Sequence, residues 1–219
     1  MDPEPTEPGA LTDAAYWDGF WEGVRLPIRI RRSSFLLSAM VRFLERELEV
    51  RPGERFLEVG CGSSPWMPFF AERFRLTVEG VDNSPRGAEL CRRNLALLGI
   101  PGRVHEEDFF DLARREEAGW DVVASFGVIE HFEAPEELLR AKRRVLRPGG
   151  RIVVGLPHLA GFSGRVFRFV NRTEYDTHLA LPADRLRRLL EENGFEEVRC
   201  RYVGGIHMGF GPTRRWPAL

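Results

Sequence analysis

The chain has 219 residues, 43% of them hydrophobic and 30% charged, and its 32 basic residues nearly balance 33 acidic ones. This length fits a single domain over residues 1–219, and the apolar fraction is enough to build a core. Disorder, collagen and coiled coil are therefore excluded as descriptions of the whole chain. A formal net charge of −1 provides no global field that would attract nucleic acid or an anionic membrane, so such a partner would need a local patch.

Cysteine usage and the first residues indicate the compartment. Cys61, Cys91 and Cys200 form no C-x-x-C pair, so they predict neither a disulfide framework nor a zinc site, and no metal site is expected. The first residues are acidic and proline-rich, and no apolar stretch reaches the roughly 18 residues of a membrane span. These features favour a reduced, cytoplasmic location.

The first quarter of the chain is predicted to be helical. A mobile tail over residues 1–11 precedes a helical extension over 12–50, in which Thr12 or Asp13 could cap a short helix. Four aromatic side chains share one face of that helix: Tyr16, Trp17, Phe20 and Trp21. A second helix is expected from Ser34 to Val50, where apolar residues recur at every third and fourth position.

From residue 51 onward, short apolar runs alternate with segments of helical periodicity. The runs predict strands at 55–59, 76–81, 103–106, 121–126 and 151–156. Helices are predicted at 67–74, 86–98, 112–116, 136–146 and 183–193. Such alternation is typical of an α/β sandwich of three layers, with a mostly parallel sheet between helices.

Two further segments complete the organisation. The run 196–203 is predicted to add a sixth strand to the same sheet. The connection 157–182 is long and holds aromatic residues, His158 and His178, so it is predicted to help build a binding site for the acceptor. The core that binds the cofactor is expected to span residues 51–203.

Ligands of open parallel sheets bind beyond the carboxyl ends of the strands. Glycine-rich or polar clusters stand at four of these ends: 58–64, 81–84, 107–110 and 126–131. Gly60 and Gly62 permit a sharp turn and close approach of a ligand, but Pro65 stands where a dinucleotide site would have its third glycine. The helix after the turn can still present N–H groups to a carboxylate, which needs fewer hydrogen-bond donors and less space than a pyrophosphate.

Two acids at strand ends point to a nucleoside. Asp82 can accept hydrogen bonds from ribose hydroxyls. Asp108 can accept one from an adenine amino group while Phe109 packs on the purine. Ribose, adenine and an amino-acid tail together describe S-adenosyl-L-methionine, which is the predicted cofactor.

Five motifs in order, LEVGCGSSP, VDNS, EDFF, FGVIEHF and VLRPGGR, resemble those of the class I S-adenosylmethionine-dependent methyltransferases over about residues 50–203. The resemblance implies a Rossmann-like sheet of about seven strands. The last strand would be antiparallel, and it either lies near Ile206–Phe210 or is lost at the C-terminal edge, residues 204–219. The residues implied in cofactor binding are Glu58, Gly60, Cys61, Gly62, Asp82, Asn83, Asp108, Phe109 and Phe126.

The resemblance requires no fixed catalytic triad, because the protein mainly has to align an acceptor behind the methyl group and exclude water. His131 is the candidate base for a hydroxyl acceptor, or else it bonds a backbone carbonyl. Glu130 could contact the cofactor or acceptor, cap a helix or be solvated.

Other residues allow two interpretations each. The aromatic side chains of the first helix could form a lid or pack on the sheet, and His158 and His178 could line the acceptor pocket or be structural. Cys61 is expected to be a small buried side chain. Four arginines could bind an anionic acceptor or RNA, or simply be solvated: Arg25, Arg29, Arg31 and Arg32.

The predicted function is methyl transfer to an oxygen or nitrogen of a small-molecule acceptor, because the segments free to build a pocket are aromatic. An RNA or protein methyltransferase is the second interpretation. The Asn/Asp-Pro-Pro-Tyr/Phe signature of amino-methylating nucleic-acid enzymes is absent after the fourth strand, which makes nucleic acid the less favoured acceptor. A cofactor-binding interaction protein without turnover is the third. The sequence leaves the oligomeric state open.

Overall fold

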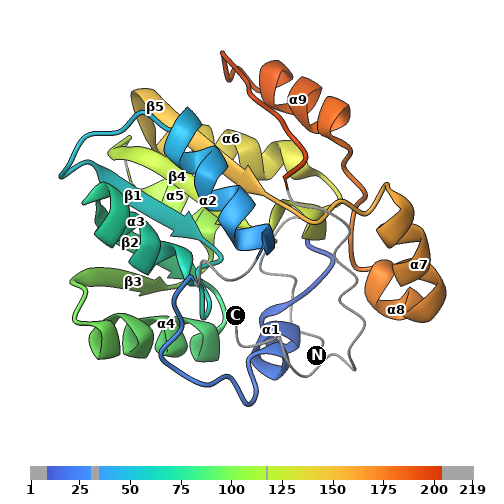
Figure 1. Cartoon of the computed structure of the whole chain (residues 1–219), viewed down its shortest axis with the longest axis horizontal. Helices are drawn as coiled ribbons and strands as arrows, with labels where there is room; N and C mark the ends of the chain where they lie inside the picture. The colour runs from blue at the N-terminus through green and yellow to red at the C-terminus, as the bar shows by residue number, and fades with distance from the viewer. Residues whose placement is uncertain (1–8, 31–34, 117, 204–219) are drawn as a thin grey trace.

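The computed structural model describes residues 9–30, 35–116 and 118–203. Its centre is a sheet of five strands: β1 (Arg55–Val59), β2 (Thr77–Asp82), β3 (Gly102–Glu106), β4 (Trp120–Phe126) and β5 (Leu146–Gly155). All strands are parallel, in the order β3-β2-β1-β4-β5 (Figure 1). The chain runs outward from β1 to β3 and then places β4 on the other side of β1. The boundary between β1 and β4 is therefore the switch point at which α/β sheets bind ligands.

Helices connect the strands and extend the chain at both ends. Those between strands are α3 (Trp66–Phe74), α4 (Pro85–Leu98), α5 (Phe109–Arg115), the short η1 (Ile129–His131) and α6 (Pro135–Val145). The others are α1 (Ala14–Phe20), α2 (Phe35–Glu47), α7 (Phe162–Val170), α8 (Arg172–Tyr175) and α9 (Ala183–Glu192). None of the helices within these described residues is long and apolar enough to cross a membrane.

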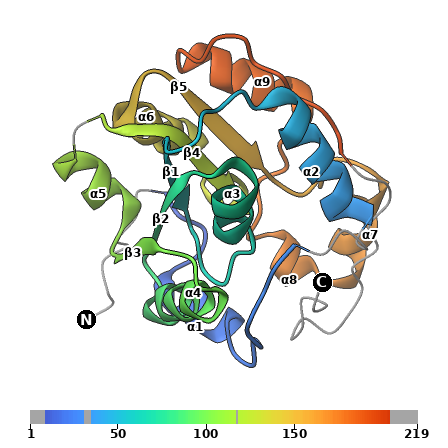
Figure 2. The same ribbon diagram turned by 60° about the vertical axis from the view of Figure 1, so that its left-hand side comes forward.

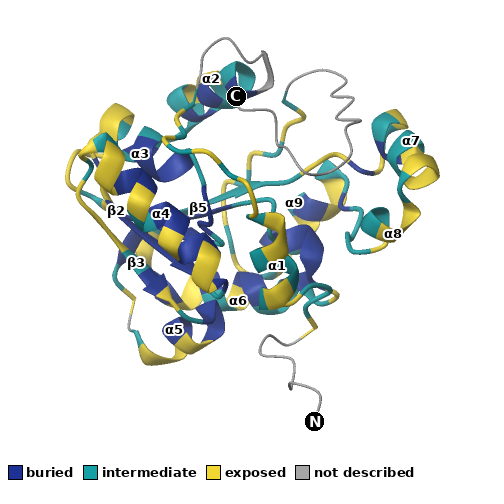
Figure 3. Cartoon of the chain, turned by 90° about the horizontal axis from the view of Figure 1, so that it is seen from below, coloured by how far each residue is buried: buried dark blue, intermediate teal, exposed yellow. Residues whose placement is uncertain are grey.

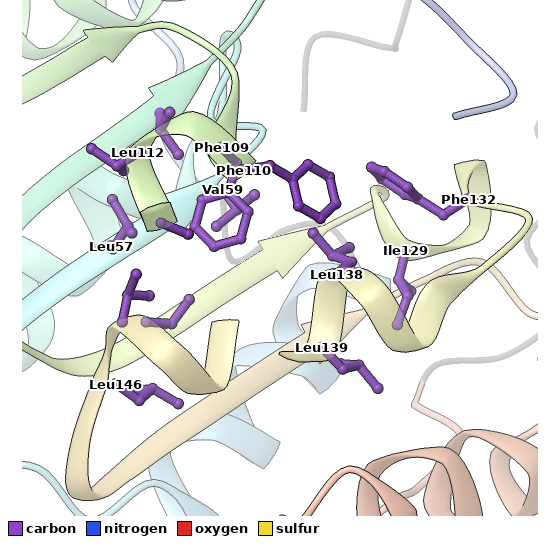
Figure 4. Packing of buried hydrophobic residues seen from close by; sticks show 14 of the residues in the cluster. Leu57, Val59, Phe109, Phe110, Leu112, Ile129, Phe132, Leu138, Leu139 and Leu146 are labelled. Atoms are coloured by element: carbon purple, nitrogen blue, oxygen red, sulfur yellow. The ribbon is translucent and has the colours of Figure 1, made fainter. Parts of the chain in front are cut away.

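The two faces of the sheet are covered by different helices, which confirms the three layers (Figure 2). Successive side chains of a strand point to opposite faces, so each buried strand contributes to two cores. Leu57, Val59 and Val123 pack with α5, α6 and α9, and Figure 4 shows part of this core. Phe56 and Val122 pack on the other face with α2, α3 and α4. The sides of the helices that face the sheet are buried (Figure 3).

The prediction of a sixth strand at 196–203 is wrong, and the described residues hold five strands rather than about seven. Val198 and Cys200 pack partly on the core, which explains the alternating pattern. Glu197, however, has a φ of 52°, and a residue in the left-handed region interrupts an extended strand. A strand near Ile206–Phe210 would lie outside the described residues.

The beginning of the described chain is tied to the loop after β4. Ala10 forms an isolated antiparallel bridge with Phe132, and the Leu11 N–H donates to the His131 carbonyl at 2.7 Å. These contacts fall within the segment 1–11, whose first eight residues lie outside the described part. Asp13 then caps α1 by accepting from the Tyr16 N–H at 2.7 Å. This pairing places α1 beside the carboxyl ends of the strands.

Candidate cofactor and acceptor site

The glycine turn after β1 and the acid that ends β2 meet at the edge of the sheet. Asp82 accepts hydrogen bonds from the Gly62 N–H (2.7 Å, to Oδ2) and the Ser84 N–H (2.9 Å, to Oδ1). Gly60 and Gly62 have φ angles of 68° and 33°, which other residues rarely adopt. A Cβ on Gly60 would lie 2.6 Å from Val128 Cγ2, so the turn also contacts the loop after β4. Segments from both sides of the switch point therefore converge.

The Asp82 carboxyl is buried in this arrangement. Burial raises its pKa to about 6, and the nearby charge of Asp18 acts in the same direction. The two backbone donors oppose this shift because they stabilise the ionised form. Asn83, which follows, is partly exposed and lines the same cleft.

Glu58 lies beneath the turn and is fully buried. Its carboxyl accepts hydrogen bonds from the Ser64 hydroxyl and the Met67 N–H, while Oε2 has no partner among the described residues. Burial dominates and raises its pKa to about 8. The carboxyl is thus protonated at neutral pH in this environment.

Glu58→Gln should change how stability depends on pH. Since the folded pKa of Glu58 (about 8) exceeds the ordinary value of 4.5, the folded state holds a proton that the unfolded state releases between these pH values. This group therefore stabilises at low pH and loses its contribution as pH rises to 8, by at most about 1.4 kcal/mol per pH unit. Chemical denaturation from pH 5 to 8 should show that the free energy of unfolding of Glu58→Gln increases relative to that of the wild type.

The matched control is Glu133→Gln, which changes an exposed carboxylate. Its free energy of unfolding should run parallel to that of the wild type over the same range. A Glu58→Gln curve that also runs parallel would contradict the buried, protonated state of Glu58.

Asp108 caps a helix at the end of β3, whereas the neighbouring Phe109 packs in the core. Asp108 caps α5: its Oδ1 accepts from the Phe110 N–H at 2.5 Å and the Asp111 N–H at 3.4 Å. This cap explains why α5 begins three residues before the predicted helix. Asp108 Oδ2 is buried with no partner in the described chain, and burial raises the pKa of this carboxyl. The Phe109 ring packs within the core and also reaches the wall of the cleft.

Phe126 and Cys61 complete the set predicted from the sequence. Phe126 stacks on Trp66 with ring centroids 4.3 Å apart and an interplanar angle of 15°. The sequence interpretation missed Trp66, which directly precedes the predicted helix 67–74 and is the first residue of α3. Cys61 is buried, and both Cys91 and burial raise the pKa of its thiol, so it is a packing group as expected.

His131 faces the 157–182 connection across the cleft. Its Nδ1 lies 3.0 Å from the Thr177 carbonyl oxygen, so Nδ1 carries the hydrogen and Nε2 keeps its lone pair. His178 repeats this pattern with the Glu174 carbonyl at 2.7 Å, and the two imidazole rings are 4.3 Å apart. Burial lowers the pKa of His131 to about 4 and also lowers that of His178. Both rings are therefore neutral at pH 7.

Glu130 and Lys142 form a buried polar group that the sequence did not indicate. Glu130 is neither solvated nor a helix cap, and burial raises its pKa to about 8. Lys142 is fully buried under β4, where its Nζ donates to the Ser125 hydroxyl. Burial lowers the pKa of Lys142 to about 7, and Glu130 opposes that shift. In sequence, Lys142 reads only as one more basic residue of α6.

Helix α1 lies over the carboxyl ends of the strands and buries none of its own side chains. Asp18 accepts from the Ser84 hydroxyl at 2.5 Å, and Trp17 packs edge-on against His131 with ring centroids 5.0 Å apart. A Cβ on Gly62 would lie only 2.2 Å from Trp21 Cζ2, so the Trp21 ring rests directly on the glycine turn. This position supports the lid interpretation of these aromatic residues.

One cleft connects these groups, from the turn and Asp82 to His131, His178 and Phe167. At its floor, Glu58 Oε2 and Glu130 Oε2 are buried without partners among the described residues. The turn has no room for a side chain at position 60, where it would meet Val128, or at position 62, where it would meet the Trp21 ring. Two buried carboxyls with an oxygen unpartnered in the described chain, a glycine turn and a ribose-type acid fit an adenosyl ligand, whose cationic amino end would favour the ionised form of these carboxyls.

Four of the other predicted candidates are engaged elsewhere or fall outside the described residues. His158 lines the cleft, but its ring packs at an interplanar angle of 52° against Tyr202, with ring centroids 4.3 Å apart. Arg29 pairs with Glu72 at 2.8 Å on the surface. Arg31 and Arg32 lie outside the described residues.

Comparison with known proteins agrees with this geometry. A family model described as "Methyltransferase domain" matches residues 29–199, most of the chain. The chain therefore belongs to this family, and its fold and motifs are those of the class I S-adenosylmethionine-dependent methyltransferases.

Individual relatives are distant. The chain is 26% identical over 153 residues to the ubiquinone biosynthesis O-methyltransferase of Neisseria meningitidis, covering 66% of this chain and 64% of that protein. It is 27% identical over 180 residues to the 27-O-demethylrifamycin SV methyltransferase of Amycolatopsis mediterranei, covering 74% and 63%. The chain thus spans just under two thirds of the length of these relatives.

Among solved structures, the geranyl diphosphate C-methyltransferase of Streptomyces coelicolor superposes with a TM-score of 0.59 at 20% identity. The match covers 82% of this chain and 76% of that one. At this identity the likeness shows the shared fold.

Proposed function

We propose that the protein transfers the methyl group of S-adenosyl-L-methionine to an oxygen or nitrogen of a small-molecule acceptor. The observation that carries this proposal is the hydrogen bond between the Gly62 N–H and Asp82. It joins a glycine turn and a ribose-type acid at the switch point, in a cleft whose other end holds two neutral histidines. The O-methylating relatives, and the single-domain boundaries expected from the sequence, are consistent with it.

Each predicted residue receives a role under this proposal. Gly60, Gly62 and Cys61 form the turn against the methionine part, and Glu58 supports it from below. Asp82 and Asn83 hold the ribose. Adenine is bordered by Asp108 and Phe109, and Phe126 lies beside the cofactor at the end of β4. The cofactor supplies an electrophilic methyl group on its sulfonium, so this chain has to orient the acceptor and exclude water.

The acceptor would enter between η1 and the α7–α8 segment. Its wall there combines Trp17, His131, Phe167 and His178, which are aromatic and uncharged at neutral pH. Such a wall favours a small, partly apolar molecule over a polyanion such as RNA. If the acceptor atom is a hydroxyl oxygen, His131 Nε2 would accept its proton while the methyl carbon exchanges its bond to sulfur for a bond to that oxygen, which leaves S-adenosylhomocysteine.

Two measurements test the proposal. Isothermal titration should show binding of both S-adenosylmethionine and S-adenosylhomocysteine. Incubation of metabolite pools with a methyl-labelled donor should then give a labelled small molecule. Binding without any labelled product would favour an interaction protein, and labelled RNA or protein would identify a macromolecular acceptor. Failure of both ligands to bind would end the proposal.

Trp21→Ala should speed cofactor binding, because the Trp21 ring covers the glycine turn that the ligand needs. If uncovering costs about 1.4 kcal/mol, the association rate of S-adenosylhomocysteine rises about tenfold. Surface plasmon resonance measures this rate. Leu97→Ala is the control, since Leu97 is exposed near the C-terminal end of α4 and does not contact the turn or Trp21. Slower association in Trp21→Ala would mean that the ring holds the ligand instead of blocking it.

His131→Asn should separate the two interpretations of His131. The Asn amide can still donate to the Thr177 carbonyl, as Nδ1 does, but has no counterpart of Nε2. If Nε2 is the base, methyl transfer to a hydroxyl acceptor falls about 10²- to 10⁴-fold while S-adenosylhomocysteine affinity is unchanged. The wild-type rate should be flat from pH 6 to 8, because the pKa of His131 lies near 4. Full activity of His131→Asn would show that the residue is structural.

A further inference from the structure

Helix α7 carries an apolar stripe that faces solvent. Phe162, Phe169 and Val170 are 67%, 92% and 62% exposed. They make up half of the large hydrophobic residues exposed in the described part of the chain. Positions 162, 169 and 170 share one side of a helix with Val166, because residues seven and eight apart are nearly aligned.

The packing of α7 fixes this stripe outward. On the inner side, a Cβ on Gly164 would lie 1.8 Å from the Leu159 carbonyl oxygen, so the backbones are in close contact. Phe167 also points inward, with its ring 6.1 Å from those of Tyr175 and His178. The helix therefore cannot bury its stripe by rotating without losing these contacts. In Figures 1 and 2, α7 and α8 form one edge of the molecule, away from the β3 end of the sheet.

Positive charge borders the stripe. Arg165 and Arg168 are exposed on α7, and within the described ranges neither belongs to an ion pair. Arg172 follows on α8 and reaches Asp176 only at 3.5 Å, with three quarters of its side chain exposed. From residue 138 to residue 173 the sequence contains no Asp or Glu. Helices α7 and α8 thus carry three arginines against Glu174 and Asp176, and both acids lie on α8 or at its C-terminal end, so the positive charge is concentrated along α7 itself.

We propose that α7 docks the protein on the surface of an anionic phospholipid bilayer. Aromatic and aliphatic side chains next to arginines are the combination that an interfacial helix uses. The apolar stripe enters the boundary between headgroups and acyl chains, and the guanidinium groups face lipid phosphates. A polynucleotide would match the arginines but leave Val166 and Val170 without a partner. This docking goes beyond the proposed function and does not depend on it.

Docking would bring the cleft close to the bilayer. Phe167 lines the cleft beside His178, and Phe162 at the start of the stripe also borders it, whereas Phe169 and Val170 face away from it. One helix would thus contact lipid on one side and border the acceptor end of the cleft on the other.

Sedimentation with vesicles tests this inference on the full chain. The protein should bind vesicles of phosphatidylcholine with phosphatidylglycerol, bind phosphatidylcholine alone at least about tenfold less, and dissociate at high salt. Phe169→Asp should reduce the bound fraction about tenfold. Leu97→Asp is the matched control, because Leu97 is 61% exposed on the distant helix α4, and should bind like the wild type.

A second pair of variants separates charge from apolar contact. Arg168→Glu should remove the preference for anionic vesicles, whereas Arg93→Glu on α4 should keep it. An unchanged far-UV circular dichroism spectrum and an unchanged urea denaturation midpoint in all four variants would show that they are folded. Lack of vesicle binding, or equal loss in Phe169→Asp and Leu97→Asp, would overturn the proposal. So would binding of single-stranded RNA alone, or a dimer without lipid that Phe169→Asp dissociates.

Discussion

Asp82→Ala should weaken S-adenosylhomocysteine binding by about 10- to 100-fold. The carboxylate accepts from Gly62 and Ser84 and thereby holds the glycine turn and the start of α4 in place. Under the proposed function it also accepts from the ribose, so its removal costs a buried, charge-assisted contact of about 1–3 kcal/mol. Isothermal titration at one pH and salt concentration measures the loss.

Two controls accompany this measurement. Asp82→Asn keeps one carbonyl acceptor and should lose less affinity than Asp82→Ala, which also guards against failure of the alanine variant to fold. Glu89→Ala removes an exposed carboxylate from α4 and should bind like the wild type. Undiminished affinity of a folded Asp82→Ala would reject the ribose role.

Lys142→Ala should have the largest effect on stability, a loss of about 3–5 kcal/mol. The change removes a fully buried side chain, leaves a cavity beneath β4 and takes the donor from Ser125. Lys142→Met fills most of the volume and should recover about half of the loss. Urea denaturation measures these differences, with Arg140→Ala on the exposed side of α6 as the control.

The pH dependence supplies an independent check on Lys142. Its folded pKa is lowered to about 7, so between pH 7 and 10.5 the unfolded state binds a proton that the folded state does not. Stability therefore rises with pH in this window for the wild type and not for Lys142→Met. The difference in free energy of unfolding between the wild type and Lys142→Met should therefore increase from pH 7 to 9. A constant gap would mean that Lys142 stays charged when buried.

The cofactor end of the site was accessible from sequence because its groups follow buried strands directly. β1 coincides with its predicted bounds, and β2 and β4 differ by one residue at one or both ends. Asp82 and the glycine turn then had to meet, since parallel strands end at the same edge. Residue types close together in the sequence were therefore sufficient to predict this end of the site. The same holds for the start of α4, which Ser84 caps.

The acceptor end depended on contacts that no local pattern encodes. Trp21 rests on Gly62, and Thr177 orients His131, through pairings between distant segments. The failed strand at 196–203 has a similar origin. The alternating residues of this segment indicate which side chains are buried against the core. Pairing with a neighbouring strand also requires an extended backbone, which the pattern does not specify.

Helix α1 rests on both halves of the cleft without contributing to the core. Its attachment is therefore a small share of the global stability, and its detachment is a local event. Single substitutions in this helix can adjust how fast molecules enter and leave at nearly constant melting temperature. Selection for the rate of turnover would then act on this helix, and selection for stability would act on the core around the sheet.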